Sequence, residues 1–251
     1  MIACAALCPA APLLVRDLTG AQEVLPELRQ ACLAAVAELA ASSLEVIAVV
    51  GAGSRTGLWN GAAAMDLTRY APRRGVAGGP VSADREQTVL PAALGIGTWL
   101  LSQAGCTLPR LLQAVGADEP AVTCSAIGAE IAGSGERVGL LVMADGSARR
   151  GLKAPGYLDA RSAGFDAEIE KAVREGRLDA LLNVDQVLAR ELMAAGRPAW
   201  QVMAGALEGR KVSSEIRYCD DPFGVAYLVA SLRVREEPQP LRHEREGAAD
   251  G

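Results

Sequence analysis

Histidine is almost absent from this sequence, and its absence excludes several kinds of active site. The 251 residues include one histidine, His243, near the carboxyl end. Imidazole is the commonest side-chain metal ligand and the usual base for a cysteine nucleophile. A metal site that needs two histidines therefore cannot be assembled within one chain. No cysteine can rely on a neighbouring imidazole to become a thiolate.

Aromatic residues and basic clusters are also sparse. Aromatics make up 4% of the chain although half of its residues are hydrophobic, so alanine, leucine and valine must supply most of the core. The net charge is −5 and no predicted element carries a basic cluster, which argues against nucleic acid or a membrane surface as a partner. The apolar first residues meet Pro9, Pro12 and Arg16 too early to span a membrane, so we expect a buried strand there.

The cysteines show neither a CxxC pair nor the spacing of a zinc site. Several stand beside apolar residues, as small buried thiols do. We therefore expect core thiols in a reducing cytoplasm. The six are Cys4, Cys8, Cys32, Cys106, Cys124 and Cys219.

Five apolar residues in a row, 140–144, are the strongest local signal in the chain. Such a run predicts a strand buried on both faces, which requires helices on both sides of a sheet. It ends at Asp145, Gly146 and Ser147, which favour a tight turn. Ligands of open α/β sheets usually bind beside such turns. Asp145 and Ser147 are therefore candidate ligand-binding residues; the alternative is a turn in which both only cap backbone amides.

The remaining pattern predicts a three-layer α/β/α single domain over residues 1–235, with a mixed central sheet closed by a C-terminal hairpin. Residues 236–251 are charged and lack an apolar repeat, so we expect a disordered tail. A long irregular excursion follows residue 50. We predict strands at 1–7, 44–50, 140–144, 212–218 and 225–234. We predict helices at 26–41, 90–104, 108–115, 163–175, 178–182, 186–194 and 198–207, and leave 121–131 open.

Four short segments, in this order along the chain, resemble the class III extradiol ring-cleaving dioxygenases of the subunit-B-like kind and their Memo-like relatives. They read LCPAAPLL at 7–14, VVGAG at 49–53, MADGSA at 143–148 and PFGVAY at 222–227. The longest match runs from 140 to 166. The resemblance implies the same fold, with a cleft where the four turns meet at one edge of the sheet.

The resemblance also implies an iron site that this sequence cannot form. Catalytic members hold Fe(II) with two histidines and a carboxylate, which leaves positions open for catechol and O₂, and use another histidine as acid and base. The ligand histidines would correspond to about Ala10 and Gly53, and the acid–base histidine to about Ala148. None of these residues binds a metal or carries a proton. The third ligand would fall near 219–221.

The expected cleft draws residues from all four turns. Arg149, Arg150 and Lys153 would hold an anionic ligand or, in the alternative, lie on a solvated loop. The glycines at 51–54 would form a phosphate nest or a plain loop, and the thiols would be reactive or structural. The candidate cleft residues are Cys8, Ala10, Gly51, Gly53, Asp145, Ser147, Arg149, Lys153, Cys219, Asp220 and Asp221.

Three functions follow from this reasoning. The leading hypothesis is a divergent dioxygenase-like protein without iron or another cofactor, which binds a small acidic or aromatic ligand or a partner, or carries out metal-free chemistry. The first alternative is a ring-opening oxygenase that holds Fe(II) with Asp145, Cys219, Asp220 and Asp221. The second is a non-catalytic subunit that pairs with a catalytic homologue or with its own copies.

Overall fold

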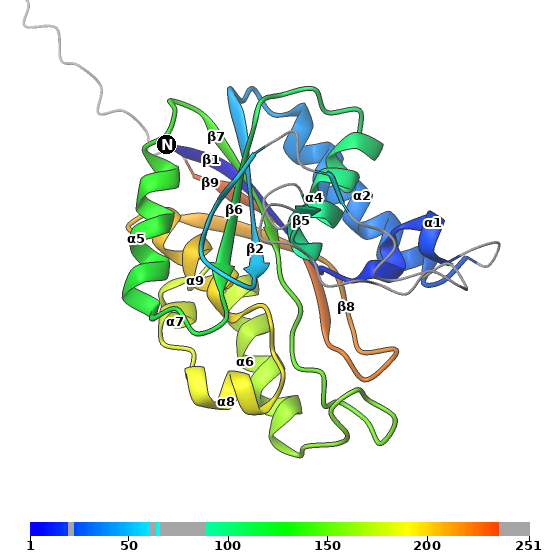
Figure 1. Cartoon of the computed structure of the whole chain (residues 1–251). Helices are drawn as coiled ribbons and strands as arrows, with labels where there is room; N and C mark the ends of the chain where they lie inside the picture. Colours follow the sequence, from blue (N-terminus) through cyan, green and yellow to red (C-terminus); the bar gives the residue numbers. More distant parts are fainter. Residues whose placement is uncertain (20–22, 61–63, 66–88, 236–251) are drawn as a thin grey trace, which may run out of the picture.

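A seven-stranded mixed sheet forms the middle of the protein in a computed structural model that describes residues 1–19, 23–60, 64–65 and 89–235 (Figure 1). The strand order is β3-β6-β2-β7-β1-β9-β8. These strands are β1 (Ile2–Cys8), β2 (Val46–Gly53), β3 (Gly57–Trp59), β6 (Arg110–Gly116), β7 (Val138–Met143), β8 (Val212–Asp220) and β9 (Tyr227–Val234). Two short strands, β4 (Ala64–Met65) and β5 (Val89–Leu90), pair separately.

The central strand β7 lies between β1 and β2 and runs parallel to both. All six of its residues are buried, which confirms the prediction of a strand covered on both faces. β6 continues the parallel part beside β2. β3, β9 and β8 run antiparallel to their neighbours, so the sheet is mixed, as predicted.

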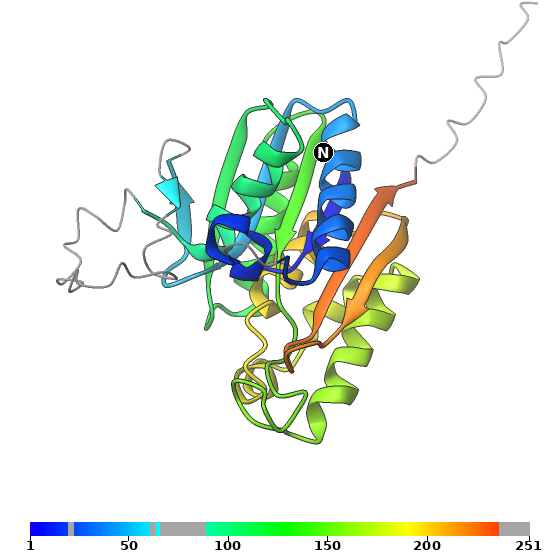
Figure 2. The ribbon, with the colours of Figure 1, turned by 90° about the vertical axis from the view of Figure 1, so that its right-hand side faces the viewer.

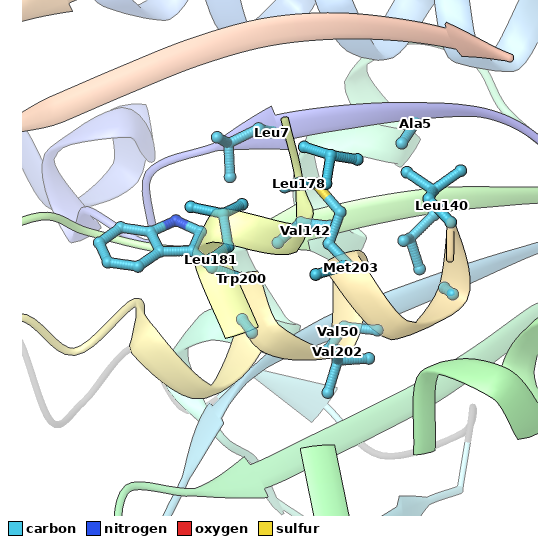
Figure 3. Packing of buried hydrophobic residues seen from close by; sticks show 14 of the residues in the cluster. Ala5, Leu7, Val50, Leu140, Val142, Leu178, Leu181, Trp200, Val202 and Met203 are labelled. Carbon is cyan, nitrogen blue, oxygen red and sulfur yellow. The ribbon is translucent and has the colours of Figure 1, made fainter. Parts of the chain in front are cut away.

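Helices cover both faces of the sheet (Figure 2). Helices α5, α6, α7 and α9 lie on the face to which Leu7 and Val142 point, and Figure 3 shows Trp200 of α9 in this layer. Helices α2 and α4 cover the other face, where Cys8 and Met143 lie. Successive strand residues therefore enter opposite layers, and the three-layer α/β/α fold is confirmed. The helices are η1 (Pro12–Leu14), α1 (Arg16–Thr19), α2 (Pro26–Ala41), α4 (Ala92–Gln103), α5 (Ala121–Ala132), α6 (Arg161–Glu175), α7 (Asp179–Leu182), α8 (Gln186–Glu191) and α9 (Arg197–Ala206).

Helices α5 and α9 approach each other through glycine. A Cβ added to Gly128 would lie 2.2 Å from the backbone oxygen of Val202, and one added to Gly205 would lie 2.4 Å from that of Ser125. No side chain fits at either distance. The contact between these helices therefore depends on a glycine in each of them.

Residues 108–115 do not form the predicted helix, and this prediction is wrong. They belong largely to β6, in which Leu112 and Ala114 enter one buried cluster while Leu111 and Val115 contact the other. A short apolar run fits a helix or a strand equally well, and here pairing with β2 decides the outcome. Residues 121–131, which the pattern left open, lie in α5.

The other predicted helices and strands are confirmed with small shifts of their ends. The largest shifts are in β2, which continues to Gly53, and in α8, which already ends at Glu191. Part of the excursion (61–63 and 66–88) and the predicted tail (236–251) lie outside the described residues. Within the described ranges, no helix has both the length and the apolar character needed to cross a membrane.

Candidate functional site

Turns from four distant parts of the chain lie at the carboxyl edge of the parallel strands. β1, β7 and β2 are neighbours and end there, whereas the antiparallel β9 begins there and β8 ends there. The Ala144 N–H donates to the Cys8 oxygen at 2.8 Å, and the Gly146 N–H donates to the Ala226 oxygen at 2.9 Å. Figure 1 shows the β8–β9 turn beside the loop that follows β7. The structure thus brings the predicted turns to one edge of the sheet.

Asp145 occupies the end of the central strand. Its Oδ1 accepts a hydrogen bond of 2.9 Å from the Ala10 N–H, which comes from the turn after β1. The residue is partly exposed. Burial of its carboxyl raises the pKa to about 6, although the Ala10 N–H acts in the opposite direction. The carboxyl of Asp145 is therefore held by the turn after β1, and its pKa lies well above that of an ordinary aspartate.

Asp145 faces weakly acidic groups on the α2 side of the sheet. A hydrogen bond with Cys8, together with burial, raises the pKa of the Cys32 thiol, and the charge of Asp145 adds to this effect. Burial raises the pKa of Tyr227 to about 12, again with a contribution from Asp145. The Cys32 thiol and the Tyr227 phenol are therefore neutral at pH 7, whereas the Asp145 carboxyl changes its charge near pH 6.

Tyr227 and Cys32 are site neighbours that the sequence alone did not identify. Cys32 was expected as a core thiol and is buried in α2, but that expectation did not reveal which groups it faces. Tyr227 is the last residue of the fourth segment that resembles the dioxygenases, but the resemblance assigned it no role. Its place follows from the antiparallel register of β9 beside β1.

Ser147 has a structural role, which corrects the expectation that it offers a hydroxyl to a ligand. It is fully buried, its Oγ donates to Asp166 Oδ2 at 2.5 Å and its N–H donates to Asp166 Oδ1 at 2.9 Å. Arg150 lies 3.8 Å from Asp166 and donates to Asp221 at 2.6 Å. These pairs tie the loop after β7 to α6 and to the β8–β9 turn. The Asp221 carboxylate is therefore also occupied, by the Arg150 guanidinium of the same chain.

The other polar candidates are spread over the loop and the hairpin. Lys153 is exposed, and the buried Nε of Arg149 has no hydrogen-bond partner among the described residues. Cys219 is exposed on β8, and burial of its sulfur together with the nearby Glu170 raises the pKa to about 11, so the thiol stays protonated. Asp220 Oδ1 accepts from the next backbone N–H at 2.8 Å.

The positions at which the resemblance would place iron ligands and the acid–base histidine have neither the donors nor the space for them. A Cβ on Gly53 would lie 2.8 Å from the Cβ of Ala114, so a larger side chain has no room there. Ala10 and Ala148 carry methyl groups, which cannot coordinate a metal. In the described part of the chain, no group of three histidine, cysteine, aspartate or glutamate side chains is placed to hold a metal ion.

Gly51 and Gly53 belong to a paired strand, which corrects the expectation of a loop or phosphate nest lining a cleft. Gly51 pairs with Met143 and Gly53 with Gly116. A Cβ on Gly51 would lie 2.5 Å from the Cβ of Ala93 in α4. The glycines therefore allow close packing of β2 against its neighbours.

Exposed apolar side chains gather on the loop after β7 and on its neighbours. Gly156 packs against the sulfur of Met193, and Gly224 packs against Ala154, so these segments are contiguous. Tyr157 and Met193 have left-handed backbones, with φ of 60° and 56°, which is uncommon for large residues. We call this surface the loop patch; its members are Leu152, Tyr157, Leu158, Met193 and Phe223, each between 46% and 77% exposed.

The geometry defines an α/β protein with a candidate ligand site at the carboxyl edge of its sheet. No family model matches the sequence, and no curated protein matches it. Among solved structures, the uncharacterized protein JW3007 from Escherichia coli K12 has a similar fold, with a TM-score of 0.53 and 15% sequence identity. The alignment covers 92% of this chain and 99% of that chain. At this identity the similarity shows the fold alone.

Proposed function

We propose that this chain is a divergent member of the class III extradiol dioxygenase group that has lost the iron site and binds a small organic ligand at the carboxyl edge. The observation that carries the proposal is Asp145, a partly exposed residue whose carboxyl is held by the Ala10 N–H at the end of the central strand. The four resembling segments and the α/β/α fold support the relationship. The lack of metal donors at Ala10, Gly53 and Ala148 supports the loss of iron.

Asp145 suits a ligand that carries hydroxyl or carboxyl groups. With a pKa of about 6, its carboxyl accepts hydrogen bonds when ionised and donates one when protonated. A catechol would donate its hydroxyls to the ionised form, whereas an acidic ligand would be bound more tightly below pH 6. Arg149 and Lys153, on the following loop, offer positive charge to an acidic ligand.

Replacing Asp145 with asparagine is expected to weaken binding of catechol and of 3,4-dihydroxybenzoate by about tenfold at pH 7.5. The charged acceptor is lost, and hydrogen bonds to charged groups contribute roughly 1.5–3 kcal/mol. Isothermal titration calorimetry of the iron-free full chain measures this change. Asp118→Asn, which alters an exposed aspartate paired with Arg190, is the matched control and should bind like the wild type. Equal affinity in the Asp145→Asn chain, or no binding by the wild type, would refute the role of Asp145.

A second candidate function is pairing with another copy of this chain through the loop patch. Large exposed apolar surfaces are typical of protein interfaces. The edge of the patch carries both signs of charge, because Arg161 contacts Asp159 and Glu191 beside it and Lys153 lies on the loop. A surface with both signs can face its own copy across a two-fold axis with opposite charges in contact.

The double change Leu152→Ser and Phe223→Ser is expected to convert a dimer into a monomer, since it removes two large exposed apolar side chains from the loop patch. Size-exclusion chromatography with light scattering reports the mass. Val122→Ser, which removes an equally exposed side chain from α5, should leave the dimer intact. A wild-type monomer at micromolar concentration, or a dimer that survives the double change, contradicts this second function.

We propose the cytoplasm as the compartment of this protein. All six cysteines are free, and four of them are buried, as expected for thiols that act as small core residues. A reducing compartment preserves this state, whereas the exposed Cys219 would be open to oxidation elsewhere.

A further inference from the structure

A large cavity lies at the end of the sheet opposite to Asp145. It has a volume of about 800 Å³, within the range of sites for small organic molecules. We call it the amino-end cavity, because the start of β1 and the segment before β7 line it together with the ends of α2 and β9. The candidate residues of the carboxyl edge do not contribute to its lining.

The inner wall of the amino-end cavity is apolar. Ala3 of β1 and Ala35 and Leu39 of α2 line it. The pairing of β1 with β7 shifts between Ile2 and Cys4, so Ala3 has no partner on β7 at this point. Such a bulge bends the strand and often marks a binding site. Here it lies in the cavity wall, so the irregular backbone and the hollow coincide.

The outer wall carries more positive than negative side chains. Three arginines and two glutamates line the cavity, and Glu38 is paired with Arg233. Arg137 donates from Nε to the Ser43 oxygen, and Arg210 contacts the sulfur of Met1. Neither guanidinium forms an ion pair among the described residues. Both are therefore available to an anion, with Glu136 as the one acidic side chain of the lining that no arginine pairs.

We propose that the amino-end cavity binds an organic anion with an apolar body, such as a medium-chain carboxylate. The acidic group would contact Arg137 and Arg210, since guanidinium groups hold carboxylates through two parallel hydrogen bonds. The apolar part would cover the alanines and Leu39. This site is separate from the proposed ligand site at Asp145, with which it shares no lining residue.

The test uses 8-anilinonaphthalene-1-sulfonate, a fluorescent anion with an apolar body, and decanoate as its competitor. The full chain is expected to bind one molecule of the dye and to release it when decanoate is added. Arg137→Ala together with Arg210→Ala should weaken binding of both probes at least tenfold, and added salt should weaken wild-type binding. Arg174→Ala together with Arg177→Ala, at the exposed end of α6, is the matched control and should bind like the wild type.

Cysteine labelling locates the bound probe. Cys4 lines the cavity, whereas Cys219 is exposed on β8. Decanoate should slow alkylation of Cys4 at pH 9 and leave that of Cys219 unchanged. The proposal is overturned if decanoate does not displace the dye, or if Cys4 is not protected. It is also overturned if the Arg137→Ala and Arg210→Ala double variant binds the dye like the wild type, or if the Leu152→Ser and Phe223→Ser variant loses dye binding instead. A result in which only a chain ending at residue 235 binds the dye would overturn it as well.

Discussion

Replacing Gly128 with valine is expected to lower the free energy of unfolding by more than about 4 kcal/mol, or to prevent folding. Any Cβ at this position would lie 2.2 Å from the backbone oxygen of Val202, and backbone cannot move aside as a flexible side chain can. Helix α5 would have to separate from α9. That separation would open the buried layer that includes Cys124, Trp200 and Val202.

Urea denaturation followed by circular dichroism measures this effect. Gly164→Ala is the matched control, because no atom lies within 4 Å of an added Cβ there and the position is inside α6. Alanine favours a helix interior over glycine by roughly 1 kcal/mol, so the control should be slightly more stable than the wild type. A Gly128→Val chain as stable as the wild type would show that α5 and α9 do not pack as closely as the structure has them.

The change Asp145→Asn is expected to alter the pH dependence of stability. The folded-state pKa of about 6 lies above the ordinary value of 3.8. Between these pH values the folded protein keeps a proton that the unfolded chain has released, so the free energy of unfolding falls as pH rises. The loss is complete above about pH 7. It amounts to about 2 kcal/mol after allowance for the partial solvent access of the side chain.

Asparagine has no proton to lose in this range, so the variant escapes that loss. Its stability relative to the wild type should therefore increase by about 2 kcal/mol between pH 4 and pH 7. Urea denaturation at each pH gives the two curves, and Gly164→Ala serves as a non-titrating reference whose difference from the wild type stays constant. A constant difference for Asp145→Asn would show that Asp145 is ionised as readily as in water.

The sequence predicted those parts of the fold that are determined by residues close together in the chain. The apolar run at 140–144 is short and is stopped by turn residues, which favours a strand covered on both faces and places Asp145 directly after its end. The residues 108–115 were misassigned because their apolar residues satisfy a helical and a strand period at once. Pairing with β2, more than 50 residues earlier in the chain, decided between the two.

The candidate site was predicted less well, since it depends on partners far apart in the chain. From the sequence, the Ser147 hydroxyl was a candidate to bind a ligand. In the structure it donates to the carboxylate of Asp166, which is 19 residues away on α6. The packing of Gly51 against Ala93 could not be predicted without knowing where helix α4, which follows the excursion, lies on the sheet. Local residue types therefore identified which turns are polar, and the tertiary structure decided which of their side chains remain available.

The proposed loss of the iron site is tested most directly by elemental analysis and native mass spectrometry of the full chain after anaerobic incubation with Fe(II) and desalting. Without histidine in the domain, Fe(II) would have only carboxylates, thiols and water as ligands. We predict much less than one iron per chain, no ring-opened product from catechol, and a mass shift when catechol is bound without metal. One equivalent of retained iron together with a yellow ring-opened product would contradict the account.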